Sequence, residues 1–269
     1  ASDVYKRQEH VVAVASGKGG VGKSSVAANL AVALSTEGYR VGLLDADIYG
    51  PSQGAMMGVA DARPKVNGDR LQPVMAHGIQ CMSLGFVTSP NTPAVWRGPM
   101  ASGALEQLLT QTEWDNLQVL LVDMPPGTGD IQLTLSQRAP LSGAVIVTTP
   151  QDIALLDARK GIEMFSKVQV PTLGIIENMS TYICSECGHE DAIFGSGGGG
   201  SIAAEYQTRV LAQLPLSISV RHQSDQGVPI VVSAPDDPAS ESLRNAARDI
   251  ASALQEGQPK GPSINVLDD

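Results

Sequence analysis

The chain has 269 residues, of which 42% are hydrophobic and only 4% aromatic, so aliphatic side chains must fill most of its core. Its 18 lysines and arginines against 28 aspartates and glutamates give a net charge of −10. This charge argues against non-specific binding to nucleic acid or to an anionic membrane, and no apolar run approaches the roughly 20 residues that span a bilayer. Three cysteines and no secretory signal pattern favour a reducing, cytoplasmic environment.

A glycine-rich loop lies near the start of the chain. Residues 1–10 are polar and are expected to form a disordered lead-in, and the apolar residues 11–15 predict a strand. Residues 26–34 predict a helix, which gives the strand, loop and helix of a phosphate-binding loop. Backbone N–H groups of such a loop approach a polyphosphate closely, with Lys23 at the β- and γ-phosphates and Ser24 at Mg²⁺. The expected nucleotide-binding residues are Gly17, Lys18, Gly19, Gly20, Val21, Gly22, Lys23, Ser24 and Ser25.

Two lysines of this loop are candidate catalytic residues. Lys23 and Lys18 would stabilise negative charge on a transferring phosphoryl group. Because Lys23 would face the ligand rather than the core, we expect Lys23→Ala to abolish nucleotide hydrolysis with little change in stability. Lys18 stands where the general motif allows any residue, and its alternative interpretation is a solvated lysine that adds local positive charge.

A second apolar strand, residues 39–47, ends in two carboxylates, Asp45 and Asp47. Ligands of open parallel sheets gather at the carboxyl ends of strands, and residues two apart share a face of a strand. Both side chains are therefore expected at the phosphate site, and residues 48–52 form a candidate switch. A helix cap or turn role is the alternative for either aspartate. The irregular residues 54–97 predict a hairpin or an insertion over the sheet.

A third apolar run, residues 119–123, ends in Asp123 and matches the Walker B pattern, in which the carboxylate orders Mg²⁺, often through water. Residues 124–130 are rich in proline and glycine and predict a stiff loop near the ligand. Further signals are strands at residues 144–148 and 172–177, a helix capped by Asp152, and a helix that starts at Asp237 and Pro238. This alternation predicts one doubly wound α/β domain with a mostly parallel sheet over residues 11–255 and a disordered tail at residues 256–269.

Cys184 and Cys187 carry the second chemical signal, because two thiols separated by two residues can bind one metal centre. They fill only half of a tetrahedral site, and Cys81, in an apolar run, is expected to be a buried, inert thiol. Two chains related by a two-fold axis would supply four thiolates, which suit either an iron–sulfur cubane or zinc. A thioredoxin-type redox pair is a weaker interpretation, because that motif opens a helix.

Together these motifs resemble the Mrp/ApbC iron–sulfur cluster carrier family of deviant Walker A P-loop ATPases, relatives of MinD and ParA. The loop fits the deviant pattern KGGxGK[ST]. The matching segments are residues 17–25, 44–52, 95–100, 123–130 and 178–180, with the CxxC at Cys184 and Cys187. The resemblance implies a cytosolic homodimer that hydrolyses ATP and delivers a transient 4Fe-4S cluster, bridging two subunits, to apo iron–sulfur proteins, in contact with the cluster assembly machinery.

The resemblance also implies roles for single residues. The implied roles are Lys18 acting on the partner's nucleotide, Asp47 orienting the attacking water, Asp45 supporting the switch, Ser24 and Asp123 holding Mg²⁺, and Asn178 contacting the adenine. Two alternatives stay open: a zinc-stapled dimeric ATPase without cluster transfer, and a positioning ATPase of the ParA or MinD kind. The net charge of −10 and the CxxC count against the second.

Overall fold

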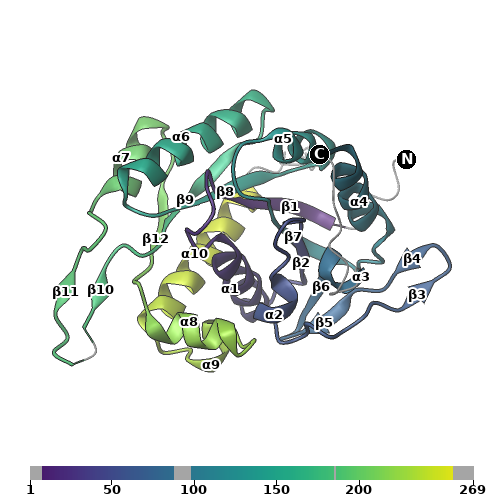
Figure 1. Ribbon diagram of the computed structural model, residues 1–269, viewed down its shortest axis with the longest axis horizontal. Helices are drawn as coiled ribbons and strands as arrows, with labels where there is room; N and C mark the ends of the chain where they lie inside the picture. Colours follow the sequence, from purple (N-terminus) through teal and green to yellow (C-terminus); the bar gives the residue numbers. More distant parts are fainter. Residues whose placement is uncertain (1–7, 88–97, 185, 257–269) are drawn as a thin grey trace, which may run out of the picture.

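The computed structural model describes residues 8–87, 98–184 and 186–256 (Figure 1). Its centre is an eight-stranded sheet in the order β12-β9-β8-β1-β7-β2-β6-β5, in which only β5 runs antiparallel to its neighbour. The strands are β1 (Gln8–Ala15), β2 (Val41–Asp45), β5 (Val74–Ala76), β6 (Ile79–Ser83), β7 (Leu117–Asp123), β8 (Gly143–Thr148), β9 (Thr172–Glu177) and β12 (Val210–Gln213). The expected α/β fold with a mostly parallel sheet is confirmed.

Helices cover both faces of this sheet (Figure 1). The helices are α1 (Lys23–Thr36), α2 (Gln53–Met56), α3 (Leu84–Val87), α4 (Gly98–Gln111), α5 (Asp130–Arg138), α6 (Asp152–Lys167), α7 (Gly198–Glu205), α8 (Ile218–Asp225), α9 (Ile230–Ser233) and α10 (Pro238–Glu256). In Figure 1, α4 to α7 lie along one side of the sheet, and α1 and α8 to α10 lie along the other. No helix in the described part of the chain is both long and apolar enough to cross a membrane.

Burial on both faces explains why the central strands read as continuous apolar runs. Residues 11–15 of β1 and residues 119–123 of β7 are all buried. The strands β1, β7 and β2 are parallel neighbours, and Asp45 pairs in register with Asp123. The two carboxylates that end β2 and β7 are therefore side by side at one edge of the sheet, next to the loop that follows β1.

Two short hairpins extend from this body. They are β3 (Val66–Asn67) with β4 (Arg70–Leu71), and β10 (Tyr182–Ile183) with β11 (Glu190–Asp191). The first belongs to the irregular region expected to hold a hairpin or an insertion, and β5 and β6 of that region extend the sheet itself. Residues 88–97 of it lie outside the described residues. The second hairpin carries the cysteine pair.

The structure corrects two boundaries predicted from the sequence. The strand β1 begins at Gln8, which pairs with Leu117, so the expectation of a disordered lead-in was wrong for residues 8–10. Residues 1–7 and 257–269 lie outside the described residues. The helix α6 begins at Asp152 itself, with Gln151 as its N-cap and no side-chain capping bond, so the predicted Asp152 cap was also wrong.

Candidate functional site

The phosphate loop connects β1 to α1 through glycines that the geometry requires. Gly20 and Gly22 have φ values of 84° and 81°, in the left-handed region that other residues rarely adopt. A Cβ atom on Gly17 would lie 2.1 Å from the backbone oxygen of Asp157, and one on Gly22 would lie 2.3 Å from Nδ2 of Asn178. Gly22 caps α1 without a side chain, so the first N–H groups of the helix are free of a capping oxygen and suit an anion.

Lys23 lies at the centre of an acidic site. Its side chain is 6% exposed and forms an ion pair with Asp123, which is fully buried. Its Nζ also lies 3.9 Å from Oδ2 of Asp47 and 3.3 Å from Oγ of Ser24. The structure thus brings together Lys23, Ser24, Asp47 and Asp123, as the motifs predicted. The buried ion pair argues against the expectation that Lys23→Ala would change stability little, because the substitution would leave a buried carboxylate without its cation.

Asp45 holds the segment that follows β2. Its side chain is 1% exposed. It accepts hydrogen bonds from the backbone N–H groups of Asp47, Ser52 and Gln53 at 3.1, 2.9 and 3.0 Å, and from the Ser83 hydroxyl at 3.1 Å. Asp45 therefore anchors residues 47–53 at both ends.

Burial shapes the electrostatics of these carboxyl groups. It raises the pKa of Asp45 from 3.8 to about 7, and the charge of Asp123 adds to this rise. Burial also raises the pKa of Asp47, whereas the Lys23 ammonium acts in the opposite direction. A site with several crowded carboxylates and one lysine suits a divalent cation, so the residues present fit the expected Mg²⁺.

Two buried residues of this region escaped the motif analysis. Gln53 is 2% exposed and donates from Nε2 to Oδ2 of Asp123 at 2.7 Å. Glu177 is 1% exposed and accepts from the backbone N–H of Gly199 at 2.5 Å and from Nε2 of Gln213 at 2.9 Å. Neither residue has a characteristic spacing to the motifs, so only the fold reveals their contacts.

Asn178 directly follows Glu177 at the end of β9 and reaches the phosphate loop. Its Nδ2 donates to the backbone oxygen of Val21 at 2.9 Å, and its backbone N–H donates to Thr148 at 2.8 Å. A cavity of about 20 Å³ adjoins it and is also lined by Ser25 of the loop and by Pro215. The residue expected to contact an adenine thus lies beside the phosphate loop and helps to hold it.

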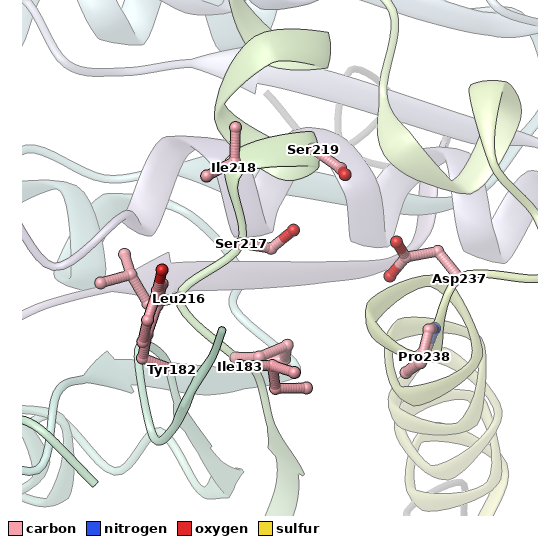
Figure 2. Close-up of a pocket in the computed structure, with 9 residues that line it drawn as sticks. Tyr182, Ile183, Leu216, Ser217, Ile218, Ser219, Asp237 and Pro238 are labelled. Atoms are coloured by element: carbon pink, nitrogen blue, oxygen red, sulfur yellow. The ribbon is translucent and has the colours of Figure 1, made fainter. Parts of the chain in front are cut away.

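A larger cavity, of about 180 Å³, lies between β10 and the starts of α8 and α10 (Figure 2). It shares the lining residue Pro215 with the small cavity. In Figure 2, the hydroxyl groups of Ser217 and Ser219 point toward the side on which the Asp237 carboxylate lies. Ile183 lies below them in this view. The lining combines aliphatic side chains with a few hydroxyl and carboxyl groups, as in many small-molecule sites.

The cysteine pair occupies the tip of the β10–β11 hairpin, which projects from the body of the molecule (Figure 1). The backbone N–H of Cys184 donates to His189 at 2.9 Å, and the N–H of Gly188 donates to Cys184 at 2.9 Å, which closes a tight turn. Cys184 is half-buried and Cys187 is exposed. A hydrogen bond from the backbone of Cys187, followed by one from Glu186, lowers the pKa of the Cys184 thiol, which favours the thiolate.

The described residues of one chain do not complete a metal site around this pair. In the described ranges, no group of three or more His, Cys, Asp or Glu side chains could hold a metal ion. Cys81 is 2% exposed on β6, and burial raises the pKa of its thiol to about 12. The prediction that Cys81 is a buried thiol is confirmed.

Sequence comparisons match the chain to a family of known proteins. A family model described as NUBPL iron-transfer P-loop NTPase matches residues 7–251. An iron–sulfur cluster carrier protein of Pseudomonas fragi is 60% identical over 86% of this chain and 81% of its own length. An iron–sulfur cluster carrier protein of Escherichia coli is 54% identical over 91% of this chain and 67% of its own length.

Solved structures extend the comparison to the fold. A nucleotide-binding protein of Archaeoglobus fulgidus in complex with ADP is 35% identical, with a TM-score of 0.77 over 87% of this chain and 92% of that one. The cell division ATPase MinD of Pyrococcus furiosus shares the fold at 20% identity, with a TM-score of 0.68 over 91% of this chain and 99% of that one. The chain belongs to the Mrp/ApbC family of iron–sulfur cluster carriers, within the NUBPL-like P-loop NTPases.

Proposed function

We propose that this chain is an ATPase that, as a homodimer, carries a transient 4Fe-4S cluster and delivers it to apo iron–sulfur proteins. The observation that carries the proposal is the presence, in one chain, of two chemically separate sites. One is a phosphate loop surrounded by carboxylates, and the other is a projecting, half-complete pair of thiols.

The nucleotide half of the proposal rests on the ends of β1, β2 and β7. The loop from Gly17 to Ser25 would bind the phosphates, with Lys23 and Lys18 stabilising the charge of the transferring group. Ser24 would hold Mg²⁺ directly and Asp123 would hold it through water, and the bound ion would neutralise phosphate charge. Lys23 would exchange its ion pair with Asp123 for the nucleotide phosphates.

Two aspartates would work on the hydrolytic step and on its consequences. Asp47, at 3.9 Å from the Lys23 ammonium, would orient the attacking water. Asp45 would hold the switch, because its hydrogen bonds fix residues 47–53. Hydrolysis would release the segment carrying Asp47 and the loop at residues 124–130, and so alter the dimer.

We place the nucleotide base in the two cavities that share Pro215 as a lining residue. Asn178 lies between the phosphate loop and the smaller cavity, and the larger cavity offers enough room for a flat ring. Its hydroxyl and carboxyl groups, Ser217 and Asp237, would accept or donate hydrogen bonds at the edge of the base. The adenine preference comes from the family.

The cluster half of the proposal follows from ligand number. A cubane cluster requires four ligands, and the hairpin supplies two thiols, those of Cys184 and Cys187. Two hairpins brought together by a two-fold axis would supply four thiolates, and their exposed position suits a cargo that must be released to another protein. The reduced thiols require a reducing compartment, which we take to be the cytoplasm.

The test is anaerobic reconstitution with iron and sulfide, followed by absorption spectra, metal analysis and transfer to an apo iron–sulfur protein. ATP hydrolysis is measured on the same preparation. The proposal predicts a broad cluster absorbance, iron and sulfide in equal amounts, cluster transfer and Mg²⁺-dependent ATP hydrolysis. Stoichiometric zinc without iron uptake would favour the zinc-stapled ATPase instead. Hydrolysis without any metal at the thiols would favour a positioning ATPase.

A further inference from the structure

Gln53 makes an unusual set of contacts at the nucleotide site. It begins α2, and its buried amide group donates from Nε2 to Oδ2 of Asp123 at 2.7 Å and to the backbone oxygen of Ser24 at 3.0 Å. A carboxylate and a carbonyl oxygen are acceptors only, so the NH₂ end of the amide must face both of them. This orientation of the Gln53 side chain is therefore fixed by its neighbours.

The same residue is tied to the switch through its backbone. The N–H of Gln53 donates to Oδ2 of Asp45 at 3.0 Å, next to the bond from Ser52 at 2.9 Å. Gln53 thus joins the end of β2, the end of β7 and the start of α1. Any movement of residues 47–52 that shifts Gln53 also shifts the donor that holds Asp123.

The chemical character of Gln53 suits a metal site. One oxygen of Asp123 faces the Lys23 ammonium and the other faces the Gln53 amide. A neutral donor fixes the carboxylate without cancelling the negative charge that a divalent cation requires, whereas a second lysine or arginine would cancel it. The amide oxygen Oε1 is buried and has no hydrogen-bond partner among the described residues, and buried acceptors without a partner are rare in folded proteins.

We propose that Gln53 is a positioning residue for Mg²⁺, which aligns the Asp123 carboxylate for the metal and links that alignment to the switch. The proposal rests on the proposed nucleotide function and assigns to it a residue that the motifs do not contain. Partners that orient a metal-binding group through a hydrogen bond typically change metal affinity about ten- to hundredfold when they are removed.

The test measures how much Mg²⁺ strengthens the binding of ADP. The dissociation constant of a fluorescent ADP analogue is measured in EDTA and in saturating Mg²⁺. The magnesium ratio is the value in EDTA divided by the value in Mg²⁺. Gln53→Met keeps the length of the side chain and removes both polar atoms. Gln53→Asn keeps the amide but is one methylene shorter, so it cannot bridge Asp123 and Ser24. Gln80→Met is the matched control, because the Gln80 amide bridges to the Asp115 backbone at 2.9 and 2.8 Å, away from the site.

We expect the magnesium ratio to fall about tenfold or more in both Gln53 variants, with binding in EDTA changed less than about twofold. Gln80→Met should keep the wild-type ratio. A wild-type magnesium ratio in either folded Gln53 variant would overturn the proposal. This includes the case in which ADP binding weakens equally in EDTA and in Mg²⁺. A wild-type protein that binds ADP without any gain from Mg²⁺ would overturn both this proposal and the magnesium part of the proposed function.

Discussion

Replacing Lys23 by methionine should destabilise the protein even though Lys23 belongs to the ligand-binding loop. The side chain is 6% exposed, and its partner Asp123 is fully buried. Removing one member of a buried ion pair costs about 3–5 kcal/mol, because the other charge stays buried without compensation. The hydrogen bond from Gln53 to Asp123 stays in place but carries no charge to offset it.

This cost is large on the scale of the whole molecule. Domains are stable by about 5–15 kcal/mol, and in a chain of this size each kcal/mol shifts the melting temperature by about 2–4 °C. We therefore expect Lys23→Met to lower the melting temperature by about 6–20 °C in EDTA without nucleotide.

The assay is thermal and urea unfolding of four proteins: wild type, Lys23→Met, Asp123→Asn, and the double variant. Because the double variant has neither buried charge, it should recover most of the stability that Lys23→Met loses. The Arg159–Glu205 pair on the surface provides the control, and Arg159→Met should cost less than about 1 kcal/mol. A Lys23→Met protein within about 1 kcal/mol of wild type, or a double variant without recovery, would refute the reasoning.

Three further predictions concern single side chains. The raised pKa of Asp45, about 7 against 3.8, means that the folded protein binds a proton which the unfolded chain releases. Stability in EDTA should therefore fall as the pH rises from about 4 to about 7, and urea unfolding should show that Asp45→Asn flattens this fall. If Lys18 acts on the partner's nucleotide, mixing Lys18→Ala with Asp47→Ala protein should partly restore ATP hydrolysis. No recovery, with heterodimers confirmed by mass, would indicate that both residues act on the nucleotide of their own subunit. Glu177→Ala would leave the buried N–H of Gly199 unpaired, so urea unfolding should show a loss of about 1–3 kcal/mol, and an unchanged midpoint would contradict that role.

The sequence predicted those features of the two sites that depend on short, local sequence patterns. The glycine loop, the carboxylates that end β2 and β7, and the cysteine spacing are local patterns. The alternation of strands and helices brings the loop and the carboxylates to one edge of a parallel sheet. The burial of Cys81 was predicted correctly because it lies within an apolar run, and Cys184 and Cys187 lie in a loop, as expected from their polar surroundings.

The remaining features depend on contacts between distant segments. Gln53 lies in an irregular stretch, and its amide meets Asp123, 70 positions away, only when β2 and β7 are adjacent. The burial of Lys23 against the Asp123 carboxylate was missed because the motif describes only the contact of this lysine with a nucleotide. The start of β1 at Gln8 was missed because polar residues at the edge of a strand leave no apolar signal.

The central claim is that two copies of this chain share one cluster at Cys184 and Cys187. Native mass spectrometry of the anaerobically reconstituted protein tests it most directly, because it reports chain number and bound iron and sulfide in the same particle. The account predicts dimers that carry one four-iron, four-sulfide cluster, in wild type and in Cys81→Ala alike, and dimers or monomers without iron when Cys184 or Cys187 is alanine. A complete cluster on a single chain, or loss of the cluster in a folded Cys81→Ala protein, would contradict it.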